Sequence, residues 1–293
     1  MSDLVVGTLP VAAPPRRHAS RRFFRHRLAV LGLVVIVALA LSAAFAPWIA
    51  PYNPDDVDIA NRYAPPLSLG HLLGSDDLGR DVLTRLMYAG QISLSVGVAA
   101  MAVTVIVGFA VGAFAAYLGG WVDVALMRLT DTMLCFPSVF LLLFVAAFVT
   151  PSLASISLMI GLTCWMELAR VVYGQIRVLK SADFVAAARM VGAPVWRIIL
   201  RQILPNVMAP ILVAATLNTA NAILLESYIS FLGYGIQPPQ ASWGNMLTNA
   251  QSDFLVDPWL AVMPGLAITL AVTSFNIIGD GLRDALDPKM QQQ

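Results

Sequence analysis

The chain has 293 residues, of which 58% are hydrophobic and only 12% are charged. A soluble protein of this length needs about 25% charged residues, so the composition excludes a soluble globular domain and indicates an integral membrane protein. The net charge of +1 gives no sign of a nucleic-acid partner, and none is expected.

The first apolar segment, residues 28–49, follows a tail of residues 1–27 that has six arginines between Arg16 and Arg27. A secretory signal has an apolar core of about 7–15 residues, whereas this run has about 20. We therefore expect an uncleaved membrane helix. The arginines are expected to anchor the tail in the cytoplasm and to contact anionic membrane lipid.

Five further segments are expected to cross the membrane, because each is apolar over about 20 residues, the length that spans roughly 30 Å of hydrocarbon. No charge occurs between Asp131 and Glu167, which is about 50 Å of helix, so the chain must turn near residues 150–152. The sequence thus predicts an all-α polytopic membrane protein with six transmembrane helices. The further spans are residues 92–117, 132–149, 153–173, 206–229 and 258–278.

Positive side chains indicate the orientation, since lysine and arginine are retained on the cytoplasmic side. Of the 18 lysines and arginines, only Arg62, Arg80 and Arg85 fall outside the membrane if the N-terminus is cytoplasmic. We therefore expect both termini in the cytoplasm. The cytoplasmic segments would be residues 1–27, 174–205 and 279–293, and the external loops residues 50–91 and 230–257.

The first external loop combines glycines with carboxylates and guanidinium groups at helical spacing. Asp77 precedes Arg80 by three residues, and Asp81 precedes Arg85 by four, so each pair is predicted to form an ion pair. The acidic residues argue against a phosphate-binding loop. The candidate residues here, favoured as a brace for an outer gate, are Asp76, Asp77, Gly79, Arg80, Asp81 and Arg85.

The cytoplasmic stretch of residues 183–206 is predicted to form two helices joined by a sharp corner. Ser181 is the expected N-cap, and Asp183 lies in the first turn, where a carboxylate is favourable. Gly192 suits a left-handed helix end, and Pro194 suits the start of the next helix. Because a helix this short is not stable alone, we expect it to lie in a groove of another protein or on the inner leaflet. Its apolar stripe is Phe184, Ala187, Ala188 and Val191.

This stretch resembles the coupling loop of permease subunits in bacterial ATP-binding-cassette importers, whose pattern is Glu-Ala-Ala, three residues, Gly, and then a Leu-Pro pair. Ala186 replaces the acidic residue and Gln202 replaces an isoleucine, so no role of that carboxylate carries over. The matching positions are Ala187, Ala188, Gly192, Leu204 and Pro205. The resemblance implies docking to an ATPase through Asp183, Phe184, Ala186, Ala187, Ala188, Arg189, Gly192, Ala193 and Pro205.

Two other segments strengthen the resemblance. Residues 73–94 are similar to a signature of C-type subunits of dipeptide and oligopeptide permeases, with Ser75 and Thr84 as departures. Residues 226–246 are similar to the run that links the last two spans, and their glycines and prolines predict a loop or short re-entrant piece. The resemblance implies a type I importer fold, with one N-terminal helix before a five-helix core of residues 92–280.

By this resemblance the chain forms half of a path for dipeptides or oligopeptides across a bacterial inner membrane. The implied partners are a second permease subunit, ATPase subunits that bind ATP and Mg, and an extracytoplasmic binding protein that the external residues would alternatively contact. Neither Lys180 nor Lys289 follows a glycine-rich loop, so we expect no enzyme activity and no cofactor in this chain. Nickel, haem-like compounds, glutathione and cell-wall peptides are alternative substrates within the family.

Polar residues within the spans are candidates for the path itself. Asn218 and Asn221 share a helix face and either line the path or bond to a neighbouring helix. Glu226, near the outer end of the same span, is the third candidate. Glu167 and Arg170 are expected near the inner surface, where they either pair with each other, which is favoured, or reach the lipid headgroups.

Other pairs of residues are expected to serve packing. Gly108 and Gly112 predict a close helix crossing. Cys135 and Cys164 are expected to pack without forming a metal site.

Two other functions are compatible with a polytopic membrane protein. A self-sufficient secondary carrier or channel requires ionisable relays and inverted repeats within the spans, yet His18, His26 and His71 all lie outside them. A membrane-embedded hydrolase or transferase is disfavoured, because the sequence has neither an HExxH helix nor a Gly-x-Ser-x-Gly elbow. The importer subunit is therefore the favoured interpretation.

Overall fold

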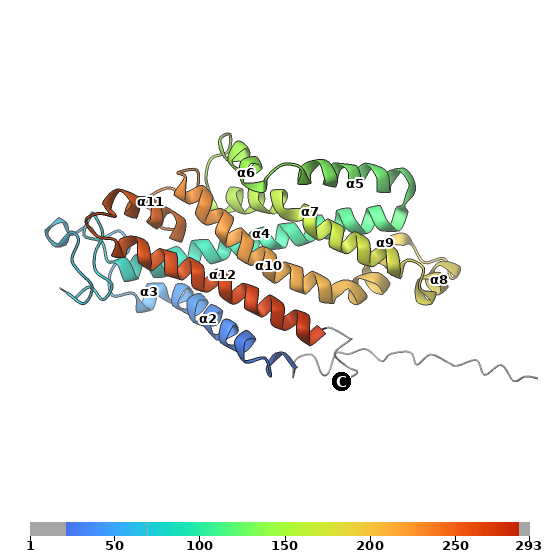
Figure 1. Ribbon diagram of the computed structural model, residues 1–293, viewed down its shortest axis with the longest axis horizontal. Coiled ribbons are helices and arrows are strands. Elements are labelled where there is room, and N and C mark those ends of the chain that lie inside the picture. Colours follow the sequence, from blue (N-terminus) through green and yellow to red (C-terminus); the bar gives the residue numbers. More distant parts are fainter. Residues whose placement is uncertain (1–21, 69, 287–293) are drawn as a thin grey trace, which may run out of the picture.

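The structure, a computed structural model, describes residues 22–68 and 70–286. Over this part of the chain the regular elements are helices, joined by turns and two isolated bridges. Five helices are long and apolar enough to cross a membrane, and a bent pair makes a sixth crossing if it is counted as one span. Figure 1 shows the long helices lying side by side along the molecule. The prediction of an all-α membrane protein is confirmed.

The spanning helices are α2 (Arg27–Ala44), α4 (Val82–Leu118), α7 (Leu153–Leu179), α10 (Leu204–Phe231) and α12 (Trp259–Leu286), with the bent pair α5 (Gly120–Leu134) and α6 (Ser138–Ala146). The shorter elements are α3 (Ala46–Ile49), a 3-10 turn (Ile59–Asn61), α8 (Asp183–Met190), α9 (Val195–Arg197), a π-helical turn (Ile198–Ile203) and α11 (Trp243–Asp253).

Several helices extend beyond the predicted spans. The second predicted span starts at residue 92, but α4 starts at Val82, because the Asp81 carboxylate caps the helix by accepting a hydrogen bond from the Thr84 N–H at 2.8 Å. At 37 residues, α4 is much longer than a bilayer core requires. The predicted boundaries followed the hydrophobic stretch, whereas the helix continues through polar residues that its cap and its neighbours stabilise.

The predicted third span, residues 132–149, is wrong as one straight helix. Helices α5 and α6 meet there at 87°. Pro137 is the N-cap of α6 and has no N–H to continue the α5 ladder. The bent pair instead begins at Gly120, so that Asp123 and Asp131 lie on α5.

The segment between α10 and α12 contains a helix that no local pattern predicted. Helix α11 begins at a capping box, in which Ser242 and Asn245 satisfy each other's backbone N–H groups. The expectation of a loop or re-entrant piece therefore holds for residues 232–242, while residues 243–253 are helical.

The α4–α7 crossing forms the centre of the bundle. A Cβ atom added at Gly108 would lie 2.9 Å from the Trp165 carbonyl oxygen, and one added at Gly112 would lie 2.4 Å from that of Ala169. The predicted close helix crossing is thus confirmed, because only glycine leaves room for the facing backbone.

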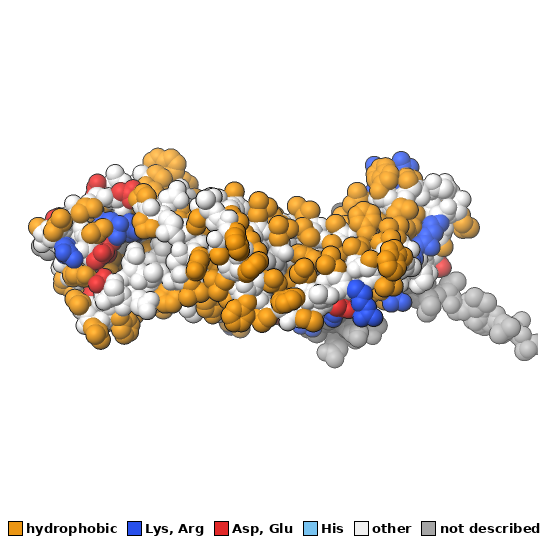
Figure 2. Space-filling model, turned by 90° about the horizontal axis from the view of Figure 1, so that it is seen from above, with side chains coloured by type: hydrophobic (Ala, Val, Ile, Leu, Met, Phe, Trp, Pro, Cys, Tyr) orange, Lys and Arg blue, Asp and Glu red, His pale blue; other side chains and the backbone are white. Residues whose placement is uncertain are grey.

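The two ends of the bundle differ in structure and in charge. The loop of residues 50–81 and α11 lie at one end, whereas α8 and α9 lie at the other (Figure 1). Figure 2 shows charged side chains gathered toward the two ends, with hydrophobic side chains over the middle. This distribution matches a helix bundle that is surrounded by lipid along its middle.

Candidate functional site

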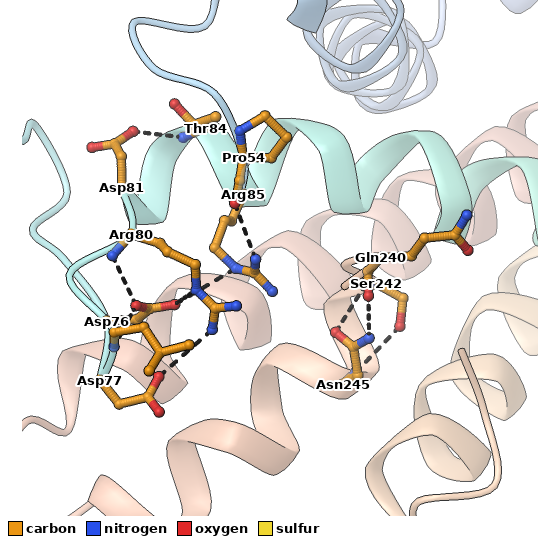
Figure 3. A network of polar contacts seen from close by, with 11 residues as sticks. Pro54, Asp76, Asp77, Arg80, Asp81, Thr84, Arg85, Gln240, Ser242 and Asn245 are labelled. Atoms are coloured by element: carbon orange, nitrogen blue, oxygen red, sulfur yellow. Dashed lines mark hydrogen bonds and ion pairs between the residues drawn. The ribbon is translucent and has the colours of Figure 1, made fainter. Parts of the chain in front are cut away.

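The end of the bundle that holds residues 50–81 is organised by the Asp76 carboxylate. One oxygen, Oδ1, accepts hydrogen bonds from the N–H groups of Leu78 and Arg80, each at 2.9 Å. The other, Oδ2, accepts from Arg80 Nε at 2.8 Å and lies 3.6 Å from Arg85 Nε (Figure 3). One side chain therefore fixes both the turn and the two guanidinium groups.

The predicted pair of Asp77 and Arg80 is present, with 3.6 Å between Asp77 Oδ1 and Arg80 Nη2. Partial burial, together with the nearby charge of Asp76, raises the pKa of Asp77 above its ordinary value. Asp77 is thus held in an environment that disfavours its charge, although Arg80 partly offsets this.

The predicted pair of Asp81 and Arg85 is wrong. Asp81 lies 2.9 Å from His71 Nδ1 and also caps α4, whereas Arg85 donates to the carbonyl oxygen of Pro54 at 3.2 Å. An N-cap carboxylate turns back toward the first backbone N–H groups, so it does not point along the helix to the residue four positions later. His71 was missed, because it lies ten residues before Asp81 without any motif that links them.

Gly79 shapes this loop through its backbone alone. Its φ is +77°, and an added Cβ would lie 1.8 Å from the Asp58 carbonyl oxygen. The glycine therefore permits a contact between two parts of the loop that any side chain would prevent.

The network is largely enclosed. Arg80, Asp81 and Arg85 are 9%, 2% and 3% exposed, respectively. Asp76, Asp77 and Arg85 border a small pocket whose other wall includes Met246 of α11 and Leu260 of α12. The network thus lies where the loop of residues 50–81 meets the ends of three helices, α4, α11 and α12.

Glu226 belongs to a second network, which is buried. Its carboxylate is fully buried and accepts hydrogen bonds from Ser93 Oγ of α4 at 3.0 Å and from Ser230 Oγ at 2.7 Å. Ser93 Oγ also accepts from the Trp243 N–H, the first residue of α11, at 3.1 Å. Contrary to the prediction, Glu226 therefore does not line an open path in this structure. It links α10 through α4 to α11.

Asn218 and Asn221 border a cavity of about 240 Å³ between the α5–α6 corner, α7 and α10. Asn218 Nδ2 donates to the Ala214 carbonyl oxygen of its own helix at 2.8 Å. Glu167 of α7 lines the same cavity. Two of the three predicted path residues, Asn218 and Asn221, therefore lie together with Glu167, which was predicted to pair with Arg170.

The predicted pair of Glu167 and Arg170 is wrong. Arg170 Nη2 instead donates to Asp131 Oδ1 of α5. Arg170 pairs with α5 because Asp131 of that neighbouring helix lies within ion-pair distance of it, whereas Glu167 does not. Cys164 also lines the cavity and is partly buried, whereas Cys135 is exposed, so the expected packing role does not fit Cys135.

At the opposite end, α8 ends as predicted at Gly192, whose φ is +73°. The Gly192 N–H donates to the Arg189 carbonyl oxygen at 2.9 Å, and the Ala193 N–H donates to that of Ala188 at 3.1 Å. This is a Schellman ending. The N-cap is Ala182 and not Ser181, since the Ser181 hydroxyl donates to the Val178 carbonyl oxygen in the preceding turn.

Helix α8 has two apolar faces. Val185 is fully buried against the bundle, and Arg189 Nε donates to the Tyr117 hydroxyl at 3.2 Å, which ties α8 to the end of α4. On the other face Met190 and Val191 are each 83% exposed. The remaining predicted docking residues Asp183, Phe184, Ala186 and Ala187 are also exposed. Ala193 contributes to packing against the bundle, and Pro205 lies at the start of α10.

Comparison with known proteins gives two family matches. Residues 108–292 match the family described as binding-protein-dependent transport system inner membrane component. Residues 15–66 match the N-terminal transmembrane domain of oligopeptide transport permease C.

Curated relatives resemble nearly the whole chain. The oligopeptide transport system permease protein OppC of Haemophilus influenzae is 40% identical over 272 residues, which cover 92% of this chain and 88% of the relative. A protein of Brucella abortus, provisionally named a peptide transport system permease protein, is 40% identical over 275 residues, covering 94% and 92%. A Brucella ovis protein, provisionally named a peptide permease protein, is 39% identical over 286 residues, covering 97% and 94%.

Proposed function

Because the chain belongs to the family of binding-protein-dependent transport system inner membrane components, we propose that it is one permease subunit of an ATP-driven importer of dipeptides or oligopeptides. The family and the apolar helices make it a multi-pass inner-membrane protein. Peptide as the substrate is supported by the names of relatives that match over nearly the full length.

The observation that carries the coupling role is the exposed apolar face of α8. A soluble or interfacial surface seldom leaves Met190 and Val191 each 83% exposed beside one another unless a partner covers them. The opposite face is fixed to α4 and the π-helical turn by Val185 and Arg189. A partner that moves α8 would therefore move the bundle with it. That partner is an ATPase subunit, which supplies the ATP and Mg.

At the outer end we assign the network around Asp76 to bracing. Arg80, Asp81 and Arg85 are too buried to meet another protein directly, and their partners join the external loop to α4. An extracytoplasmic binding protein would instead meet the exposed parts of the loop, such as Ile59 and Leu67. A second, homologous permease subunit completes the path.

Purification in mild detergent with the neighbouring transporter subunits tests the assembly. We expect a stable complex that contains an ATPase, and cysteines introduced at Phe184 and Met190 should cross-link to it. A cysteine at Asp56 is the control that should not. Reconstituted vesicles should then take up a tripeptide only with ATP and the binding protein, whereas uptake by the isolated chain under an ion gradient would favour a secondary carrier.

A further inference from the structure

Glu167 is placed where a charge cannot face lipid without a large cost. Helix α7 has 27 residues. At the helical rise, Glu167 lies about 21 Å from Leu153 and about 18 Å from Leu179. A hydrocarbon slab of roughly 30 Å, placed anywhere along this helix near the membrane normal, encloses Glu167 at least about 8 Å from either face. In any such placement Glu167 lies inside the hydrocarbon and not among the lipid headgroups.

The carboxylate is also exposed and unpaired within the part of the chain that the structure describes. Its predicted partner, Arg170, is engaged by Asp131, so that pair carries no net charge and Glu167 leaves one negative charge on this face. An acid that faces lipid in this position lowers the equilibrium constant for membrane insertion of the helix by at least several tens of fold. The face must accordingly be covered by water and protein.

The surroundings of Glu167 are those of a hydrated cavity. Asn218 and Asn221 of α10 and Ser138 of α6 share its walls, and its volume of about 240 Å³ is ample for several waters. Asn221 is exposed, and no side-chain hydrogen bond to it occurs among residues 22–68 and 70–286. These groups remain available to a passing solute.

Resting on the proposed function, we propose that Glu167 is a fixed negative site in the translocation path, which attracts solutes with an ammonium group, such as peptides with a free amino terminus, and repels anions. Asn218 and Asn221 provide neutral hydrogen-bonding groups beside it. The site acts on charge and not on side-chain identity, which suits a path that must pass different peptides.

The test uses the complete importer in vesicles and does not need its natural substrate. Asn221→Cys is introduced with Cys135→Ser and Cys164→Ser, which leaves one thiol in the cavity. The rates at which a cationic and an anionic methanethiosulfonate reagent modify this thiol are then compared. The comparison is made with Glu167 intact and with Glu167→Gln. Asp56→Asn is the control, because it removes a charge from the external loop. The thiol should prefer the cationic reagent, and Glu167→Gln should lower the ratio of rates by about tenfold, whereas Asp56→Asn should not.

A ratio that Glu167→Gln leaves unchanged, or a thiol that neither reagent reaches in any nucleotide state, overturns the proposal. Uptake of trialanine is measured in parallel, in vesicles that retain both native cysteines and Asn221. Glu167→Gln should reduce it at least tenfold while ATP hydrolysis continues. If the unmutated importer takes up no trialanine but the reagent preference is found, the peptide function fails and the charged path remains.

Discussion

Gly79 shows how strongly one backbone position controls the outer loop. Its left-handed φ of +77° and its contact with Asp58 bring together two parts of residues 50–81. In the same loop Asp76 accepts three hydrogen bonds, and one of them comes from the guanidinium group of Arg80, which balances the charge of the carboxylate. A substitution at either residue should therefore disturb the contacts of the whole network.

Gly79→Ala is expected to destabilise the protein by more than the about 1–2 kcal/mol that a left-handed conformation costs an alanine, because the new Cβ would overlap the Asp58 carbonyl. Gly120→Ala is the matched control, since its φ is +57° and nothing lies within 4 Å of an added Cβ. Thermal unfolding in detergent compares the two variants. Equal losses of stability would show that the contact with Asp58 does not matter.

Asp77→Asn should change how stability depends on pH. Burial and Asp76 raise the pKa of Asp77 above its ordinary value of 3.8, so the folded state holds the proton more tightly than the unfolded state. This contribution is fully present below the ordinary value and is lost as pH rises through the raised one. The unfolding temperature of the parent should therefore fall relative to that of Asp77→Asn over this interval. If the unfolding temperatures of the parent and of Asp77→Asn changed in parallel with pH, the raised pKa of Asp77 would be contradicted.

At the scale of elements, the close α4–α7 crossing and the attachment of α11 decide how rigid the bundle is. The crossing depends on Gly108, Gly112 and Gly161, each of which faces an atom of the opposite helix within 3 Å of an added Cβ. Helix α11 is attached through Trp243, whose N–H reaches Ser93 and whose indole N–H donates to the Leu86 carbonyl oxygen at 3.1 Å.

Gly112→Ala should push α4 from α7, since an added Cβ lies 2.4 Å from the Ala169 carbonyl oxygen. We expect a loss of about 1–3 kcal/mol, the usual effect of overpacking. Gly174→Ala in α7 is the control, because its added Cβ meets nothing within 4 Å and alanine favours a helix by up to about 1 kcal/mol. The two variants should shift the unfolding temperature in opposite directions.

Ser93→Ala should loosen α11. The change removes a donor from the buried Glu226 carboxylate and an acceptor from the Trp243 N–H, and each unsatisfied group costs about 1–3 kcal/mol. Amide exchange should increase in residues 243–253. Ser95→Ala, at an exposed position of the same helix, should leave exchange unchanged. Increased exchange in both variants would assign the effect to α4 in general.

Across the whole molecule, the two ends of the bundle contain different structural features. The Asp76 network and α11 stabilise one end, and α8 projects an apolar face at the other (Figure 1). The cavity that contains Glu167 lies along α7 between them. Movement of α8 would therefore be transmitted along the rigid α4–α7 pair, past the cavity, toward the braced end.

The positive-inside distribution predicts which end faces outward. A cysteine at Asp56 should react with a membrane-impermeant maleimide in intact cells with an opened outer membrane. A cysteine at Met190 should react only after the inner membrane is permeabilised. The reverse pattern would invert the proposed orientation and place α8 beyond the reach of an ATPase.

The class of the protein and its short motifs could be predicted from the amino-acid sequence. Apolar runs reveal membrane helices because lipid penalises every exposed polar group, and Gly192 and the pair Gly108 and Gly112 act through local backbone geometry that spacing alone discloses. For the same reason the ending of α8 and the α4–α7 crossing were predicted correctly.

Which charged side chains pair depends on how the helices pack. Asp81 pairs with His71 and not with Arg85, Arg170 pairs with Asp131 and not with Glu167, and Glu226 is buried by α11 instead of lining a path. Helical spacing favours neighbours on one helix, whereas a side chain takes whichever partner the packed helices bring nearest. The direction of α5 and the position of α11 arise from contacts between segments far apart in sequence, so no local pattern specifies them.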